Sequence, residues 1–169
     1  KIIPKKFKTD KMRTIITLGV SLLLLIVQSC NTKTETKQQN TESDKNELNA
    51  IFPKGEKGTE EWFTGDAYYI SLVKADSIHS TLVGNVYFEP SGRSHWHSHP
   101  SGQILIITDG IGYHQIEGQE IEVLKKGDVV KCPPNVKHWH GASPDEGLQQ
   151  LYIIPNTERG IVEWMEPVT

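Results

Sequence analysis

The chain of 169 residues has few cysteines, no excess of positive charge and no long apolar run. Its two cysteines, Cys30 and Cys132, cannot build a disulfide scaffold or a four-cysteine zinc site. The formal net charge of −3 argues against a surface for nucleic acid, so no nucleic-acid partner is expected. The main apolar run covers residues 15–27, whereas a membrane-spanning helix needs about 20 residues. These absences leave one ordinary domain with a tail.

The basic side chains are concentrated in residues 1–29, which hold six of the 18 in the chain but only one of the 21 acidic ones. A positive start before a short apolar run is typical of an export signal, and Met12 is the expected initiator. The run ends in Val27-Gln28-Ser29-Cys30, which resembles the lipobox of bacterial lipoproteins. We therefore expect a signal peptide over residues 1–29, a lipid on Cys30 and export to the periplasmic or outer side of a membrane. An uncleaved anchor and an ordinary signal are the alternatives.

The composition changes twice after the signal. Residues 31–49 are polar, mixed in charge and free of aromatic side chains, so they cannot bury enough apolar surface to offset the entropy of ordering. We expect a flexible tether over residues 30–61 and a folded domain over residues 62–169.

The domain from Trp62 onward shows short β-rich runs separated by turn signals. The runs cover residues 68–73, 81–88, 103–108, 111–116, 120–124, 128–131 and 148–154. Such spacing predicts an all-β antiparallel sandwich or barrel. The sequence contains no internal repeat and no glycine-rich phosphate loop, which argues against nucleotide-binding folds.

Five of the seven histidines fall in two short clusters, HWHSH at residues 95–99 and HWH at residues 138–140. Alternate side chains of a strand share a face, so the histidines of each cluster point one way and Trp96 and Trp139 the other. Burying several imidazoles without a cation would leave polar atoms unsatisfied. The pattern predicts a metal site inside the barrel.

At these residues the chain resembles the cupin superfamily, whose two motifs combine H-x-H, a Glu or Gln, and a later histidine. The matching residues are Gly92, His97, His99, Gln103, Gly110, Gly127, Asp128, Pro133 and His138. A narrower resemblance, to the small single-domain cupins that include bacterial hydroxynitrile lyases, extends from Trp62 to Thr169. It is carried by WFTG (62–65), HWHSHPSGQ (95–103), KHWHGA (137–142) and VEWMEPVT (162–169). The resemblance implies a jelly-roll β-barrel that forms a homodimer.

Carried over to this chain, the resemblance makes His97, His99, Gln103 and His138 the ligands of one divalent ion. Manganese is the first expectation, and iron, nickel or zinc are the alternatives. The resemblance also makes His140 the unligated catalytic imidazole beside the metal. Some of the lyases carry a further histidine where this chain has Gln150, so one proton carrier of those enzymes is missing here.

The expected ligands are three neutral imidazoles and a neutral amide, so the ion keeps its full double charge. A cation of this kind favours anionic oxygen or nitrogen ligands and acts as a Lewis acid. The same charge lowers the pKa of His140, which predicts a neutral base. The alternative is that His140 only hydrogen-bonds a ligand.

Three further residues are candidates for the pocket: His95, Trp96 and Trp139. By its position in the cluster His95 points inward, which leaves it open as a spare ligand, a second base or a surface residue at the strand end. The two tryptophans are either core residues or pocket walls, which are commonly apolar.

The function expected from the resemblance and the ligand set is that of a metal-dependent lyase or isomerase acting on a small oxygenated substrate. Three alternatives remain: a cupin dioxygenase, a sugar-acid ketonising cupin, and a non-catalytic surface protein that binds a metal or a small acid. Cupins host many chemistries, so the motifs specify the site better than the reaction.

Overall fold

The computed structural model describes residues 48–169, which consist almost entirely of short strands. The strands are β1 (Glu56–Lys57), β2 (Phe63–Thr64), β3 (Ala67–Val73), β4 (Leu82–Phe88), β5 (Arg93–Ser94), β6 (His97–Ser98), β7 (Gln103–Ile116), β8 (Glu122–Lys125), β9 (Val129–Cys132), β10 (His138–Ala142), β11 (Leu148–Ile154) and β12 (Glu163–Trp164). One 3₁₀ turn, η1 (Thr157–Arg159), precedes β12. Within this range no helix is long and apolar enough to cross a membrane. The all-β prediction is confirmed.

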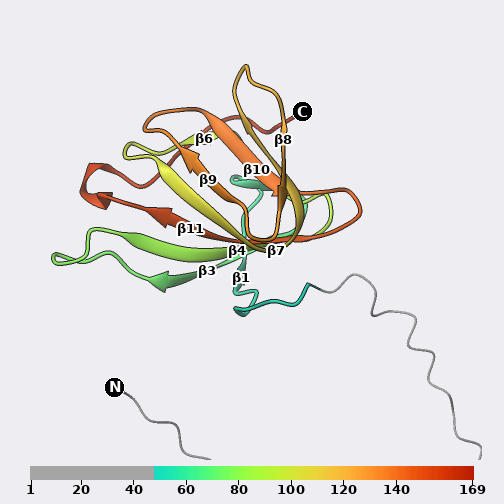
Figure 1. Ribbon diagram of the computed structural model, residues 1–169. Coiled ribbons are helices and arrows are strands. Elements are labelled where there is room, and N and C mark those ends of the chain that lie inside the picture. The colour runs from blue at the N-terminus through green and yellow to red at the C-terminus, as the bar shows by residue number, and fades with distance from the viewer. Residues whose placement is uncertain (1–47) are drawn as a thin grey trace, which may run out of the picture. The chain divides into compact units, whose positions relative to one another are not determined.

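The strands form one antiparallel sheet that curls into a half-barrel of two layers (Figure 1). In one layer β1, β3, β4 and β11 follow one another, and β11 pairs with the first half of β7. In the other layer the second half of β7 pairs with β8 and β10, and β10 pairs with β5 and β6. The long strand β7 therefore belongs to both layers and joins them.

An irregularity in the pairing of β7 with β11 lets one strand serve both layers. Gln149 pairs with Asp109 but Gln150 pairs with Ile107, so Thr108 is the extra residue. A bulge of this kind bends the strand and increases its twist. Gly110 follows at φ 84°, and a Cβ there would come within 2.0 Å of the Gly147 carbonyl oxygen. The bend thus depends on a residue without a side chain.

The core lies between the two layers. Its buried side chains alternate along the strands, as expected for sheets with one face turned inward. They include Phe63, Val86, Phe88, Leu105, Ile107, Leu124, Cys132 and Leu148. The core is extended by four partly buried aromatic residues that pack against it: Trp62, Tyr69, Tyr152 and Trp164.

The ordered sheet begins before Trp62, where the sequence analysis placed the start of the domain. β1 pairs with β3, Glu56 opposite Tyr69, and Leu48 is buried. The Gln149 amide accepts a hydrogen bond from the Ile51 amide and donates one to the Phe52 carbonyl. Residues 48–61 are thus held on the barrel, whereas the predicted signal peptide, Met12, Cys30 and the first part of the predicted tether lie outside the described residues.

Candidate metal centre

The two histidine clusters meet inside the half-barrel because β6 and β10 are paired, with His97 opposite His138. Their ring centroids lie 4.3 Å apart. His99 follows β6, and its ring lies 5.1 Å from that of His97 and 5.5 Å from that of His138. All three imidazoles are almost fully buried. The predicted ligand histidines are therefore brought together.

Backbone carbonyls fix the orientation of each of these three rings. The Nδ1 of His97 lies 2.9 Å from the His95 carbonyl, that of His99 lies 2.6 Å from the Ile161 carbonyl, and that of His138 lies 2.9 Å from the Val136 carbonyl. A carbonyl can only accept, so each Nδ1 carries the hydrogen and donates it. In a neutral ring Nε2 then has the lone pair, which is the state that a metal ligand requires.

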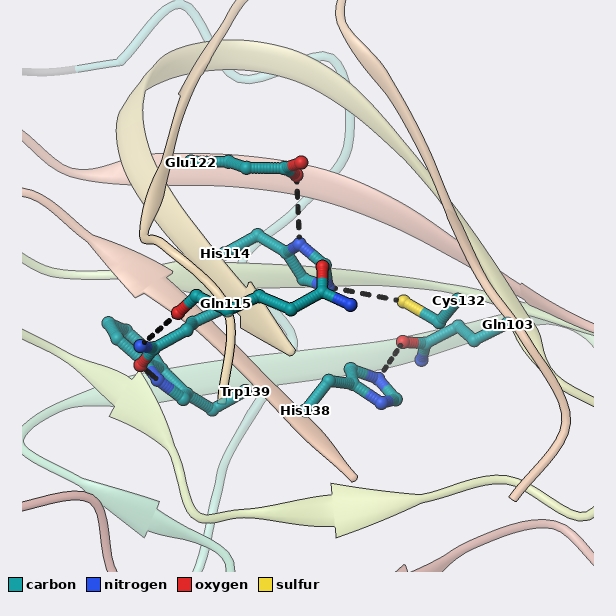
Figure 2. Close-up of polar contacts among 8 residues, drawn as sticks. Gln103, His114, Gln115, Glu122, Cys132, His138 and Trp139 are labelled. Atoms are coloured by element: carbon teal, nitrogen blue, oxygen red, sulfur yellow. Dashed lines mark hydrogen bonds and ion pairs between the residues drawn. The ribbon is translucent and has the colours of Figure 1, made fainter. Parts of the chain in front are cut away.

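Gln103, at the start of β7, completes the predicted ligand set. Its Oε1 lies 3.1 Å from Nε2 of His138 (Figure 2). Because Nδ1 of His138 carries the hydrogen, Nε2 of His138 and Oε1 of Gln103 are both hydrogen-bond acceptors and cannot bond to each other. A cation that both atoms bind would satisfy the two lone pairs. Two ligand atoms each about 2.1 Å from one ion lie roughly 3 Å apart, which fits this spacing. Nε2 of His99 is also buried, with no hydrogen-bond partner in the described part of the chain. These residues fit a divalent ion.

His140 lies beside this group on β10. Three histidines, His97, His138 and His140, each offer a ring nitrogen as a ligand atom. These three nitrogen atoms lie within 4.8 Å of one another. Unlike the other rings, His140 has its Nδ1 against a side-chain amide, the Nε2 of Gln150, at 2.7 Å. The geometry therefore offers His140 as a catalytic neighbour or as a further ligand.

Burial is the first cause of the pKa shifts in this cluster, because it disfavours the charged imidazolium. Burial and the neighbouring imidazoles hold the pKa values of His97 and His140 well below the ordinary value. Burial lowers the pKa of His138 to about 4 and also lowers the pKa of His99, and the hydrogen bond to a carbonyl opposes the shift in both. All four rings are neutral at pH 7 and available as ligands or hydrogen-bonding groups.

A cavity of about 180 Å³ opens onto the cluster. His97, His99, Gln103 and His140 line its inner end. The remaining walls are apolar or aromatic and include Trp62, Phe63, Val86, Tyr152, Ile154 and Trp164. Gly84 leaves room for one wall, since a Cβ there would come within 2.2 Å of the Tyr152 ring. The site combines a polar floor with apolar walls, as small-molecule sites commonly do.

None of the three candidate pocket residues lines this cavity. Trp139 lies on the opposite face of β10, where its Nε1 donates to Oε1 of Gln115 at 2.8 Å (Figure 2). Trp96 meets Trp139 edge to face at 6.5 Å. His95 is buried away from the cavity and acts through its carbonyl, which accepts from His97. Strand alternation turns both tryptophans to the other face, which favours the core alternative over the pocket-wall alternative for Trp96 and Trp139.

The C-terminal residues contribute more than the motifs indicated. Ile161 supplies the carbonyl for His99, and both Ile161 and Val162 line the cavity. The Trp164 ring lies 4.9 Å from His97 and stacks on Trp62 at 5.7 Å. The resemblance included this segment, but no residue-level signal identifies a backbone acceptor 62 positions from its donor.

A second polar group lies behind the metal centre. Nδ1 of His114 is 3.2 Å from Oε2 of Glu122, and Nε2 of His114 is 3.4 Å from Sγ of Cys132 (Figure 2). The His114 ring lies 5.8 Å from that of His138. Burial lowers the pKa of His114, an effect that Glu122 opposes. The sequence analysis assigned no role to this histidine.

Comparisons with known proteins place the fold and the site in one family. The model of the cupin domain matches residues 84–154, which contain all four predicted ligands. An (R)-mandelonitrile lyase from Granulicella tundricola is 42% identical over 113 residues, which make up 67% of this chain and 86% of that protein.

Solved structures of cupin proteins are also similar to this chain. A cupin-like protein from Thermotoga maritima is 49% identical with a TM-score of 0.69, covering 71% of this chain and 91% of that one. A cupin 2 conserved barrel domain protein from Rhodopseudomonas palustris shares the fold at 18% identity and a TM-score of 0.55, covering 64% and 74%. The chain belongs to the cupin family, as a single cupin domain with the predicted jelly-roll architecture.

Proposed function

We propose that the protein is a metal-dependent lyase that cleaves a small oxygenated molecule, with cyanohydrins as the first substrate class to test. The observation that carries the proposal is a cluster of three imidazoles, each with its Nδ1 held by a backbone carbonyl, next to an apolar cavity. The neutral amide of Gln103 contacts His138 and lines the cavity together with His97 and His99. The relative named as a mandelonitrile lyase supports the choice of substrate.

His97, His99, Gln103 and His138 would hold the ion, with manganese proposed first and iron, nickel or zinc as alternatives. When bound, a divalent ion supplies Lewis-acid stabilisation of negative charge on a substrate atom. Imidazole suits several of these metals and amide oxygen suits manganese, so the ligand types alone do not select one. None of the four ligands carries a charge, so an anion is the natural partner.

The chain's own residues supply binding and hydrogen bonding. The cavity volume of about 180 Å³ is comparable to a cavity of ~150 Å³ that holds benzene, so one small aromatic ring fits between the apolar walls. Those walls exclude water and strengthen the electrostatic interactions inside. His140 lines the same cavity and is the ionisable group placed to hydrogen-bond the substrate's polar atoms.

The test measures metal content and cleavage of (R)- and (S)-mandelonitrile to benzaldehyde and hydrogen cyanide by the full-length chain. We expect one divalent ion per chain and release of benzaldehyde. His138→Ala should lose both metal and turnover, whereas His140→Ala should keep the metal and lose turnover. His79→Ala, at an exposed histidine remote from the cluster, is the control and should change neither.

Metal loss in His140→Ala would make His140 a ligand. A metal-loaded protein that binds cyanohydrins, enols and uronates but converts none would instead be a binding protein. Oxygen consumption with a flavonoid or dione would favour the dioxygenase alternative.

We also propose that the chain is exported and held on a membrane by a lipid on Cys30, and that it functions as a homodimer. The charge and apolar pattern of residues 1–30 supports the anchor. The resemblance to small single-domain cupins supports the homodimer. Incorporation of labelled palmitate that Cys30→Ala abolishes would support the anchor. A monomer mass in light scattering would overturn the dimer.

A further inference from the structure

Gln150 and His140 form a buried contact between the two layers of the half-barrel. Gln150 lies on β11 and His140 on β10, and the Gln150 side chain is fully buried. Nε2 of Gln150 lies 2.7 Å from Nδ1 of His140. Two polar atoms of this pair, Oε1 of Gln150 and Nε2 of His140, are buried without a hydrogen-bond partner among residues 48–169.

The direction of this hydrogen bond determines which nitrogen of His140 carries the hydrogen. An amide nitrogen can donate but has no lone pair to accept. Gln150 therefore donates, Nδ1 of His140 accepts, and in the neutral ring the hydrogen resides on Nε2. His97, His99 and His138 have the opposite arrangement, because their Nδ1 atoms donate to carbonyls.

Two further contacts keep the His140 ring in place. Phe88 packs edge to face against it at 5.7 Å, and the backbone amide of His140 donates to Oγ of Ser94 at 3.2 Å. Because Nδ1 of His140 contacts Gln150, Nε2 is the ring nitrogen that remains available to a molecule in the cavity that His140 lines.

We infer that Gln150 is a positioning residue that holds His140 with its hydrogen on Nε2, so that His140 meets the substrate as a neutral hydrogen-bond donor rather than as a further metal ligand. The inference rests on the proposed function for the identity of the substrate. It assigns the atom that His140 recognises: an oxygen or cyanide nitrogen that gains negative charge during cleavage. A donor aimed at such an atom stabilises the transition state.

A neutral imidazole is suited to this task. A neutral histidine polarises a substrate oxygen in triosephosphate isomerase, so a ring without charge is sufficient. The base expected from the sequence would need a lone pair on Nε2, and that requires the Gln150 amide to face His140 with its oxygen. The two roles therefore differ in one observable, the position of a single hydrogen.

NMR of the histidine rings detects directly which nitrogen of His140 carries the hydrogen. The full-length chain is labelled with ¹⁵N, loaded with zinc as a diamagnetic probe and examined by long-range ¹H–¹⁵N NMR of the histidine rings. His140 should show the pattern of a neutral ring protonated at Nε2, and His97, His99 and His138 that of rings protonated at Nδ1 with zinc on Nε2. A His140 ring protonated at Nδ1, or bound to zinc, would overturn the inference.

Variants test whether Gln150 is the cause. Gln150→Glu places an acceptor against Nδ1 and should move the hydrogen of His140 from Nε2 to Nδ1. Gln150→Met removes the donor without adding a charge and should reduce the Nε2-protonated population, which keeps the test decisive if the buried Glu prevents folding. Gln149→Met is the matched control, since that glutamine is equally buried but bonds to the segment at Ile51 and Phe52.

An unchanged His140 pattern in both Gln150 variants would overturn the inference. In the cleavage assay Gln150→Glu should lower kcat/KM by about a hundredfold, with most of the loss in kcat, as expected when one such donor is removed. The NMR result stands without any turnover, so failure of the proposed reaction and failure of this inference are distinguishable.

Discussion

At the scale of single residues, Cys132 shows how far burial can change the chemistry of a side chain. Its thiol is 2% exposed and lies 3.4 Å from Nε2 of His114. Burial, assisted by the charge of Glu122, raises the pKa of the Cys132 thiol to about 12. The thiolate is the reactive form, so the geometry of a cysteine beside a histidine and a carboxylate does not make a nucleophile here.

We therefore predict that Cys132 is unreactive in the folded protein. In the Cys30→Ser variant, where Cys132 is the only thiol, an aromatic disulfide reagent at pH 8 should react at least about a hundredfold more slowly than after unfolding in urea. Equal rates in the two states would contradict the burial argument. Absorbance of the released thiolate gives both rates.

At the scale of elements, the C-terminal segment with β12 contacts two of the predicted ligands of the candidate metal centre. It provides the carbonyl of Ile161 to His99 and the ring of Trp164 to His97 and Trp62. Partners that orient a ligand typically change metal affinity by 10–100-fold when they are lost. Backbone and side-chain contributions come from different residues of the segment, so they can be separated.

Removing residues 160–169 should weaken metal binding by about 10–100-fold, because His99 loses the acceptor that fixes its hydrogen on Nδ1. Competition with a chromophoric chelator measures the affinity, and circular dichroism checks that the sheet remains. Trp164→Leu is the comparison: it keeps the carbonyl and should lower the free energy of unfolding by roughly 1–3 kcal/mol while metal affinity changes little. Undiminished affinity in the shortened chain would contradict this role.

Elements also show what the sequence could and could not predict. Turn signals and alternation predicted β3, β4, β8, β9 and β11, but they divided β7 into two runs, residues 103–108 and 111–116, which the structure joins into one strand through the bulge at Thr108. The two H-x-H patterns predicted that the histidine clusters meet. The boundary at Trp62 missed β1, because a two-residue edge strand gains its stability from pairing with β3 and has no pattern of its own. The role of Ile161 was not predictable, since every residue type has a carbonyl.

At the scale of the whole molecule, five buried imidazoles with lowered pKa values determine how stability responds to acid: His97, His99, His114, His138 and His140. In the unfolded chain each takes up a proton near pH 6.5, whereas in the folded chain it does so only at lower pH. The stabilisation from neutral histidines is therefore fully present above pH 6.5 and falls as the pH drops toward 4, the value to which burial lowers the pKa of His138.

We predict that the metal-free protein loses stability between pH 7 and pH 5. Each proton taken up only by the unfolded chain costs about 1.4 kcal/mol per pH unit. Urea unfolding at several pH values measures the slope. His114 is one of the five imidazoles and lies outside the predicted ligand set. His114→Gln should therefore reduce the pH dependence of the free energy of unfolding by about one proton. A free energy of unfolding that is independent of pH over this range would contradict the prediction.

The order of the strands has a consequence for how the candidate metal centre assembles during folding. β10 supplies His138 and His140, β11 inserts between β4 and β7, and the acceptor for His99 comes from the last ten residues. Contacts between segments so far apart along the chain form slowly, because long loops must close first. A partly folded chain thus lacks the groups that complete the candidate centre, so an ion would be captured only after the half-barrel has closed.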